Sequence, residues 1–249
     1  MAQVTALFVV EEKMRIKFAD FVFEINNKFE YIENQCKAYL TDEEQIDLFI
    51  ECSDTEIEAE RGATGVDYPA GYLESLAVYR KICSYASEHG AILVHSAVIE
   101  VDGGAYAFLA KSGTGKSTHI ALWRRALGDR VQIINGDKPI YRLIDGTFYA
   151  YGTPWCGKEG WNRNVRAPIK ALCYIERAEK NSTTKISPSD SALRFMGQLF
   201  LPSTADGVSS ALALADKLLT SVDSYIIRCN ISDEAALLAY NTIVEGEKK

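Results

Sequence analysis

Long hydrophobic runs are missing from this 249-residue sequence, and so are the cysteine spacings of zinc modules. No uninterrupted apolar stretch approaches the roughly 20 residues that a membrane-spanning helix needs. The six cysteines include no CxxC pair, and the three histidines do not complete a zinc module. The sequence therefore argues against a membrane protein, and its cysteines are best interpreted as ordinary reduced thiols.

Targeting and nucleic-acid signals are also missing. The start of the chain lacks the basic region and the small-residue cleavage site of a signal peptide, and its apolar stretch Ala6–Val10 predicts a first strand instead. No basic stripe with interleaved aromatic residues is present. We therefore expect a cytoplasmic protein that binds neither nucleic acid nor membrane.

The charge is uneven along the chain. The net charge is −7, yet residues 1–60 carry 15 acidic and 5 basic side chains, so the rest of the chain is slightly positive. Such an asymmetry is typical of a docking surface for a basic partner or of a solvated acidic face. The sequence favours the second interpretation.

Hydrophobic periodicity predicts a mixed α/β protein. Alternation over 14–32 predicts two strands joined by a turn at Asn26-Asn27-Lys28. The other expected elements, in chain order, are a strand at 46–52, a loop at 53–68, a helix at 73–86 before Gly90, a hairpin of 91–101 and 105–109 turning at Gly103-Gly104, a helix at 118–127, a strand at 131–134, a hairpin at 140–151 turning at Asp145-Gly146, a loop at 152–168, a strand at 169–175, helices at 188–201 and 205–222, a strand at 225–229 and a helix from Ser232. Because hairpins flank the central part, the sheet cannot be all parallel. We expect a β-rich acidic segment at 1–70, packed on a main domain at 71–249.

The segment Ala110–Ser117 fits the phosphate-binding P-loop pattern, with alanine in place of the first glycine. Its glycines permit backbone conformations that turn N–H groups around an anion, and the helix that follows adds its free N–H groups. Lys116 would reach the β- and γ-phosphates, and the Ser117 hydroxyl would bind Mg²⁺. The predicted nucleotide-binding residues are Ser112, Gly113, Thr114, Gly115, Lys116, Ser117 and Thr118.

A P-loop also needs an acidic partner for the metal. Asp137 follows the strand at 131–134, where its side chain can point back toward the loop. The competing interpretation is a turn residue before Pro139, because aspartate favours turns. We favour the metal ligand.

These motifs resemble the HPr kinase/phosphorylase catalytic domain, within the phosphoenolpyruvate carboxykinase-like fold. The resemblance is carried by His95-Ser96-Ala97-Val98, the P-loop, and Asn135-Gly136-Asp137, followed by Gly152-Thr153-Pro154-Trp155 and Gly157-Lys158. It covers roughly 92–176 and is specific around 95–119. Residues 1–60 do not match the N-terminal domain of the full HPr kinases.

The resemblance implies ATP- and Mg²⁺-dependent phosphorylation of a hydroxyl, and hints at a homo-oligomer. His95 matches the family's histidine. Family members usually carry two adjacent aspartates, a catalytic base and a metal ligand, where this chain has Gly136-Asp137. The base could therefore be Asp137, Glu159 or His95. The loop at 152–168 would act as a lid, in which Arg163 or Arg166 steadies phosphoryl charge or is merely solvated.

We therefore predict a kinase that transfers the γ-phosphoryl group of ATP to a serine or threonine hydroxyl. The acceptor would be a peptide, a small protein or a free hydroxy amino acid. The predicted catalytic residues are Lys116, Asp137, His95 and Glu159, and the predicted metal ligands are Ser117 and Asp137. The main alternative is a non-catalytic nucleotide-binding regulator. A decarboxylating carboxykinase is disfavoured, because that family's additional metal-binding lysine and histidine are not identifiable.

Overall fold

The computed structural model describes residues 13–246, apart from the side chain of Thr64. The strand expected at Ala6–Val10 lies outside this range. The chain forms two compact units, one containing residues 13–17 and 21–78 and the other containing residues 18–20 and 79–246. The domain boundary expected at residue 70 stays a prediction.

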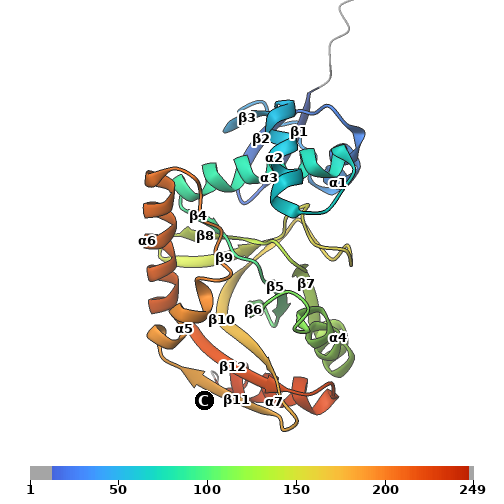
Figure 1. Cartoon of the computed structure of the whole chain (residues 1–249). Helices are drawn as coiled ribbons and strands as arrows, with labels where there is room; N and C mark the ends of the chain where they lie inside the picture. Colours follow the sequence, from blue (N-terminus) through green and yellow to red (C-terminus); the bar gives the residue numbers. More distant parts are fainter. Residues whose placement is uncertain (1–12, 247–249) are drawn as a thin grey trace, which may run out of the picture. The chain divides into compact units, whose positions relative to one another are not determined.

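The first unit combines a three-stranded sheet with helices. The sheet has the order β1-β2-β3, and β2 and β3 run parallel. Its elements are β1 (Met14–Phe18), β2 (Phe21–Asn26), α1 (Glu30–Cys36), the short helix Lys37–Tyr39, β3 (Leu48–Glu51), α2 (Asp54–Thr64) and the first part of α3 (Ala70–Glu88). Figure 1 labels the three strands and helices α1, α2 and α3 in the blue to blue-green part of the chain.

The turn expected at Asn26-Asn27-Lys28 is wrong. The chain turns between β1 and β2 at Ala19 and Asp20, whose φ angles of 53° and 55° are those of a two-residue hairpin turn. After Asn26 the chain enters α1 rather than a second strand. The alternating pattern continues past Asn26, but helix α1 buries only Ile32 and Cys36 and so needs few apolar positions.

The loop expected at 53–68 is also wrong, because helix α2 occupies most of it. Ser53 accepts a hydrogen bond from the backbone N–H of Glu56, whose side chain accepts one from the backbone N–H of Ser53. Gly65 ends the helix in the left-handed conformation, with φ 64°. This capping box and glycine stop satisfy the helix ends, and both signals are visible in the sequence.

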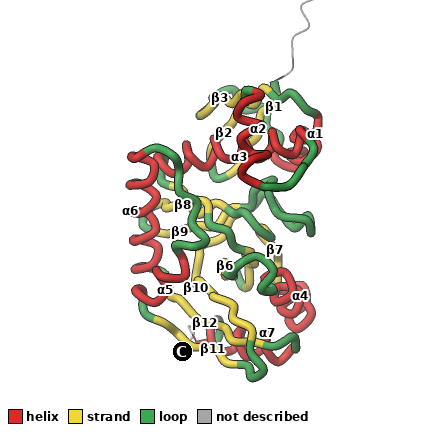
Figure 2. Tube along the Cα trace, viewed as in Figure 1, coloured by secondary structure: helices red, strands yellow, loops and turns green. Residues whose placement is uncertain are grey.

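The second unit is a mixed nine-stranded sheet covered by helices. The strand order is β4-β8-β9-β10-β6-β5-β7, with β12 beside β10 and β11 beside β12. Its elements are the rest of α3, β4 (Ala91–Leu93), β5 (Ala97–Val101), β6 (Gly104–Leu109), α4 (Lys116–Leu127), the short helix Gly128–Arg130, β7 (Val131–Asn135), β8 (Ile140–Ile144), β9 (Thr147–Tyr151), β10 (Arg166–Arg177), β11 (Ser182–Ile186), α5 (Pro188–Phe195), α6 (Ala205–Ser221), β12 (Asp223–Cys229) and α7 (Asp233–Ile243). The expected mixed α/β architecture is confirmed (Figure 2).

Strand β10 joins the two parts of this sheet. Its first residues pair antiparallel with β9, and its later residues pair parallel with both β6 and β12. Side chains alternate along the strand, so Leu172 and Tyr174 pack under α5 and α6, whereas Cys173 and Ile175 pack under α4 and α7. Both faces of β10 are therefore buried, which explains its long apolar run.

Several details of this unit differ from the sequence expectations. The stretch 91–101 is two strands: β4 pairs with β8 and β5 pairs with β6, with His95 between them. The turn between β5 and β6 lies at Asp102-Gly103, one residue earlier than expected. Helix α5 ends at Phe195, and strand β11 was not expected at all. Among residues 13–246, no helix is long and apolar enough to cross a membrane.

Candidate active site

A glycine-containing loop, Ala110–Gly115, connects the buried strand β6 to helix α4. Gly113 and Gly115 have φ angles of 77° and 126°, a region that side-chain-bearing residues rarely adopt. Gly115 is the N-cap of α4, and its carbonyl accepts the hydrogen bond of the His119 N–H at 2.9 Å. The α4 N-terminus has no side-chain cap, so its first N–H groups are available to an anion.

Arg177, the last residue of β10, fixes the shape of this loop. Its Nε donates to the Thr114 carbonyl at 2.9 Å, and its Nη2 donates to the Gly113 carbonyl. Because β10 lies parallel to β6, its carboxyl end reaches the same edge of the sheet as the loop. A guanidinium that holds two carbonyls prevents those peptide groups from turning over.

Lys116, His95 and Asp137 form a cluster at the start of α4. The Lys116 Nζ lies 3.1 Å from His95 Nε2 and donates to the Ala110 carbonyl at 3.0 Å. The same His95 Nε2 lies 3.1 Å from Asp137 Oδ1. On the other side of the ring, Nδ1 lies 3.0 Å from the Gln198 side-chain oxygen. The structure therefore brings together three of the four residues predicted to be catalytic.

The two contacts at His95 Nε2 require opposite hydrogen-bond roles of this atom. A ring that carries its proton on Nδ1 donates to Gln198 and accepts from the Lys116 ammonium. A ring that carries a proton on Nε2 donates to Asp137 instead and cannot accept from Lys116. Lys116 and Asp137 therefore compete for the same ring nitrogen.

Charge and burial act in opposite directions on Asp137. Burial favours the neutral acid, but the His95 hydrogen bond and the Lys138 ammonium, 3.3 Å from Oδ2, lower the pKa of Asp137 to about 2. Asp137 is therefore a carboxylate at neutral pH. Burial lowers the pKa of the Lys116 ammonium, and the Asp137 charge opposes that shift. Each charge of the cluster thus depends on its neighbours.

The loop at 152–165 packs directly against Gly136. A Cβ on Gly136 would lie 2.9 Å from the Cys156 carbonyl oxygen and 3.4 Å from Trp161 atoms. The Gly136 N–H donates to the Trp161 carbonyl at 2.8 Å. A second aspartate at this position would therefore clash with the loop, which gives a physical reason for the single Asp137.

Glu159 places a second carboxyl group near Asp137. Glu159 Oε2 and Asp137 Cγ both lie 3.5 Å from the point where a Cβ on Gly157 would stand. Gly157 has a φ of 79°, so this close passage of the backbone uses a conformation suited to glycine. Both carboxyl groups therefore adjoin Gly157, although Asp137 and Glu159 are 22 positions apart in the sequence.

Metal-binding groups in the described part of the chain do not form a preassembled cage. No group of three or more histidine, cysteine, aspartate or glutamate side chains is arranged to hold a metal among residues 13–246. Mg²⁺ that accompanies a nucleotide needs no such group, because phosphate oxygens and water supply most of its ligands. Ser117 lies in the first turn of α4 and Asp137 lies in the cluster beside it, so both residue types that such a site requires are present.

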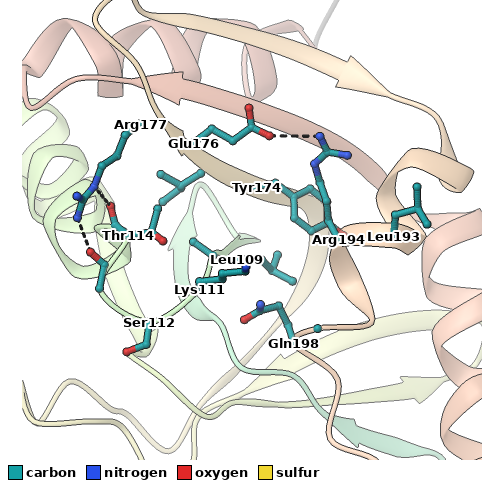
Figure 3. Close-up of a pocket in the computed structure, with 14 residues that line it drawn as sticks. Leu109, Lys111, Ser112, Thr114, Tyr174, Glu176, Arg177, Leu193, Arg194 and Gln198 are labelled. Atoms are coloured by element: carbon teal, nitrogen blue, oxygen red, sulfur yellow. Dashed lines mark hydrogen bonds and ion pairs between the residues drawn. The ribbon is translucent and has the colours of Figure 1, made fainter.

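A pocket of about 830 Å³ opens beside the loop (Figure 3). Its walls come from the loop, from the end of β10 and from α5 with the turn that follows. Leu109, Tyr174 and Leu193 line it with apolar groups, and Arg194 forms an ion pair with Glu176 at 3.2 Å. Gln198 also lines the pocket, and its side-chain oxygen hydrogen-bonds His95, so one hydrogen bond connects the pocket wall to the cluster.

A second pocket, of about 680 Å³, lies on the α4 side of the loop. It is lined by Thr118 and by residues at the carboxyl ends of β10 and β12, including Asn230 and Ile231. His119 forms part of its wall. His119 is 2% exposed, and its ring accepts a hydrogen bond from Trp123 Nε1 at 3.0 Å, so it is a packing residue.

Two residues of the site gave no signal in the sequence. Gln198 follows α5, and Arg177 is the last residue of β10. Both are far from the glycine-containing loop along the chain, and neither belongs to a motif. In contrast, Arg166 pairs with Asp20 at 2.8 Å, and Arg163 bonds Gln132 at 3.3 Å. Neither arginine contacts the cluster, so the structure offers no support for their role in steadying phosphoryl charge.

Comparisons with known proteins give a distant relationship only. No family model matches the chain, and no curated protein matches it. Among solved structures, the chain is similar to the HPr(Ser) kinase/phosphatase from Coxiella burnetii, with 12% sequence identity and a TM-score of 0.36. That similarity covers 63% of this chain and 90% of the other one. A similarity at this level assigns no residue and no substrate.

Proposed function

We propose that this protein is an ATP-dependent kinase that phosphorylates a serine or threonine hydroxyl. The observation that carries the proposal is the cluster of Lys116, His95 and Asp137 at the end of the glycine-containing loop. A loop of this shape, ahead of an uncapped helix, is suited to bind phosphates. A cationic group and a carboxylate beside it are the two kinds of group that phosphoryl transfer requires.

In this proposal, the N–H groups of Ser112–Ser117 bind the phosphates of ATP, except that of Thr114, which donates to the Lys111 carbonyl at 3.1 Å. Arg177 keeps the loop carbonyls turned away from the phosphates. Lys116 stabilises negative charge on the transferred group. Ser117 and Asp137 would hold Mg²⁺, which supplies further charge stabilisation. Thr118 lines the second pocket, so the nucleoside would lie there, at the carboxyl ends of β10 and β12.

The acceptor proton would pass to a group of the cluster. Glu159 and His95 are both placed for this role, because Glu159 lies across Gly157 from Asp137 and His95 bonds Asp137 directly. Asp137, if it is not needed for the metal, is the third candidate. Removal of the proton by a positioned base typically contributes 10²–10⁴-fold to a rate.

Two kinds of acceptor fit the surroundings. A peptide or small protein would approach along the loop at 152–165, which lies beside Asp137. A free hydroxy amino acid would fit the 830 Å³ pocket, where Arg194 and Glu176 could meet its charged groups. The second candidate function is a nucleotide-binding regulator without turnover, because this chain has one aspartate where the family it resembles usually has two.

The test is an assay with radiolabelled ATP and Mg²⁺, in which free serine, free threonine, HPr and serine-containing peptides are offered separately. Binding of MgATP is measured in parallel by calorimetry. Lys116→Ala should lose transfer and weaken MgATP binding, whereas Lys217→Ala, an exposed lysine of α6, should behave like wild type. Unchanged affinity and turnover in Lys116→Ala would refute the proposed function. Tight MgATP binding without transfer to any acceptor would support the regulator.

A further inference from the structure

Outside the proposed active site, three arginines surround a cleft of about 480 Å³. Arg124 and Arg125 come from the last turn of α4, and Arg163 comes from the loop at 152–165. Asp129 is the one acidic residue that lines the cleft. Arg125 is neutralised by Asp233 at 2.6 Å, whereas the guanidinium of Arg124 is exposed and has no ion-pair partner in the described part of the chain. The cleft is therefore suited to an anionic ligand.

One side of the cleft is lined by an edge strand of the sheet. Strand β7 is the end strand of its sheet and pairs with β5 on one side only. On the outer side of β7, the loop at 152–165 covers the end of the strand. The Arg163 N–H donates to the Ile134 carbonyl at 3.0 Å, and the Gly136 N–H donates to the Trp161 carbonyl. The first part of β7, Val131–Ile133, lines the cleft, and of these residues Val131 already donates its N–H to the Gly128 carbonyl. An open edge of this kind can accept an added strand.

The cleft and Asp137 adjoin the same loop. Gly157 passes beside Asp137, and Gly160–Arg163 forms one wall of the cleft. Ile133 and Asp137 are four residues apart, so they are separated by at most about 13 Å, and the chain bends at Gly136 and Asp137. A segment that leaves the cleft over the outside of the loop would thus bring a residue about four to six positions away next to the cluster.

We propose that the cleft is the docking site for the acceptor, and that the acceptor is an extended peptide segment with acidic residues about four to six positions from its serine or threonine. The backbone of this segment lies along the open edge at Val131–Ile133. Its carboxylates pair with Arg124 and Arg163, and an apolar side chain packs on Trp161. Phosphorylation of the bound peptide rests on the proposed kinase function, whereas binding of the peptide in the cleft does not.

Binding is tested without turnover. A fluorescein-labelled 12-residue peptide with one serine and three glutamates, four to six positions from that serine, is titrated and followed by anisotropy. The glutamates stand before the serine in one peptide and after it in another, and matched peptides carry glutamine or lysine. The glutamate peptide should bind at least tenfold more tightly than the glutamine peptide, and this preference should weaken with salt.

Charge reversal identifies the surface. Arg124→Glu with Arg163→Glu should remove the preference for the glutamate peptide and create one for the lysine peptide. Lys217→Glu is the matched control, since it reverses an exposed charge on α6 that does not line the cleft, and should change nothing. With MgATP present, the double variant should raise KM for the glutamate peptide at least tenfold and leave the MgATP affinity unchanged.

Four results would overturn the docking site. Equal binding of the three matched peptides would show that charge complementarity does not contribute to binding. An unchanged preference in the double variant would show that the peptide binds at another surface. Full competition by citrate or inorganic phosphate at the peptide's own concentration, or tighter binding of an oligonucleotide, would assign the cleft to another class of ligand. Loss of MgATP binding in wild-type protein, with selective peptide binding retained, would refute the kinase and not the docking site.

Discussion

His95 Nε2 lies 3.1 Å from Asp137 Oδ1 and 3.1 Å from Lys116 Nζ, so one ring atom contacts both the anion and the cation of the cluster. The three residues come from the break between β4 and β5, from the bend that follows β7 and from the start of α4. A change at any of them alters the hydrogen bonding of the other two. The following predictions separate their roles from those of the surrounding fold.

Asp137→Asn keeps the size of the side chain and removes its charge. We expect partial retention of nucleotide binding and a loss of Mg²⁺-dependent turnover of at least tenfold, because a positioned acid, base or metal ligand is typically worth 10²-fold or more. Rates are measured across a Mg²⁺ titration. Asp145→Asn is the matched control, because Asp145 sits in a hairpin turn with φ 46°, which asparagine tolerates. Wild-type rates in Asp137→Asn would contradict the assignment.

Arg177→Lys tests whether the loop is held in shape from β10. A lysine cannot hold the Gly113 and Thr114 carbonyls together with a planar fork, so we expect about tenfold weaker MgATP binding with an unchanged melting temperature. Calorimetry and thermal unfolding give the two readouts. Arg130→Lys, at the Asp102 ion pair, is the control for a surface arginine. Equal affinity in both variants would show that the loop keeps its shape without Arg177.

Gly115→Ala and Gly62→Ala form a matched pair, since an added Cβ meets nothing within 4 Å at either site. Gly115 has φ 126°, so alanine there should cost about 1–3 kcal/mol or deform the loop. Gly62 lies inside α2, where alanine should stabilise by about 0.5–1 kcal/mol. Urea unfolding and MgATP titration compare the two. A Gly115→Ala protein with wild-type stability and affinity would refute the conformational requirement.

His119 predicts a pH dependence of stability. Burial lowers the pKa of His119 to about 4, whereas an exposed histidine titrates near 6.5. Between these values the unfolded chain binds the extra proton, so the free energy of unfolding should fall as the pH drops from 6.5 to 4, by on the order of 3 kcal/mol, and should lose nothing further from this group below pH 4.

The measurement is urea unfolding of wild type and His119→Gln at several pH values. Other groups titrate in the same window, so the quantity of interest is the difference between the two slopes. The variant should show a shallower dependence between pH 6.5 and 4, whatever its stability at pH 7. Parallel slopes would show that burial does not depress the His119 pKa.

The sequence alone determined the elements whose signals are local. The strand before the glycine-containing loop, the helix after it, and the hairpin turning at Asp145-Gly146 all follow from short-range patterns and from glycine's conformational freedom. The capping box of Ser53 and Glu56 was equally local, and helix α2 could have been predicted from it. The turn at Ala19-Asp20 carries no comparable glycine signal, so the alternation placed it wrongly.

Only the tertiary structure decided which distant residues meet. The sheet order sets Arg177 beside the loop, brings Gln198 to the far side of the His95 ring, and packs the loop at 152–165 against Gly136. The same order leaves β7 at the edge, where three arginines surround its open side. These relationships depend on strand pairing between residues far apart in the chain. Local patterns do not encode this pairing, because it is decided by the burial of both faces of β10 between β6 and β12.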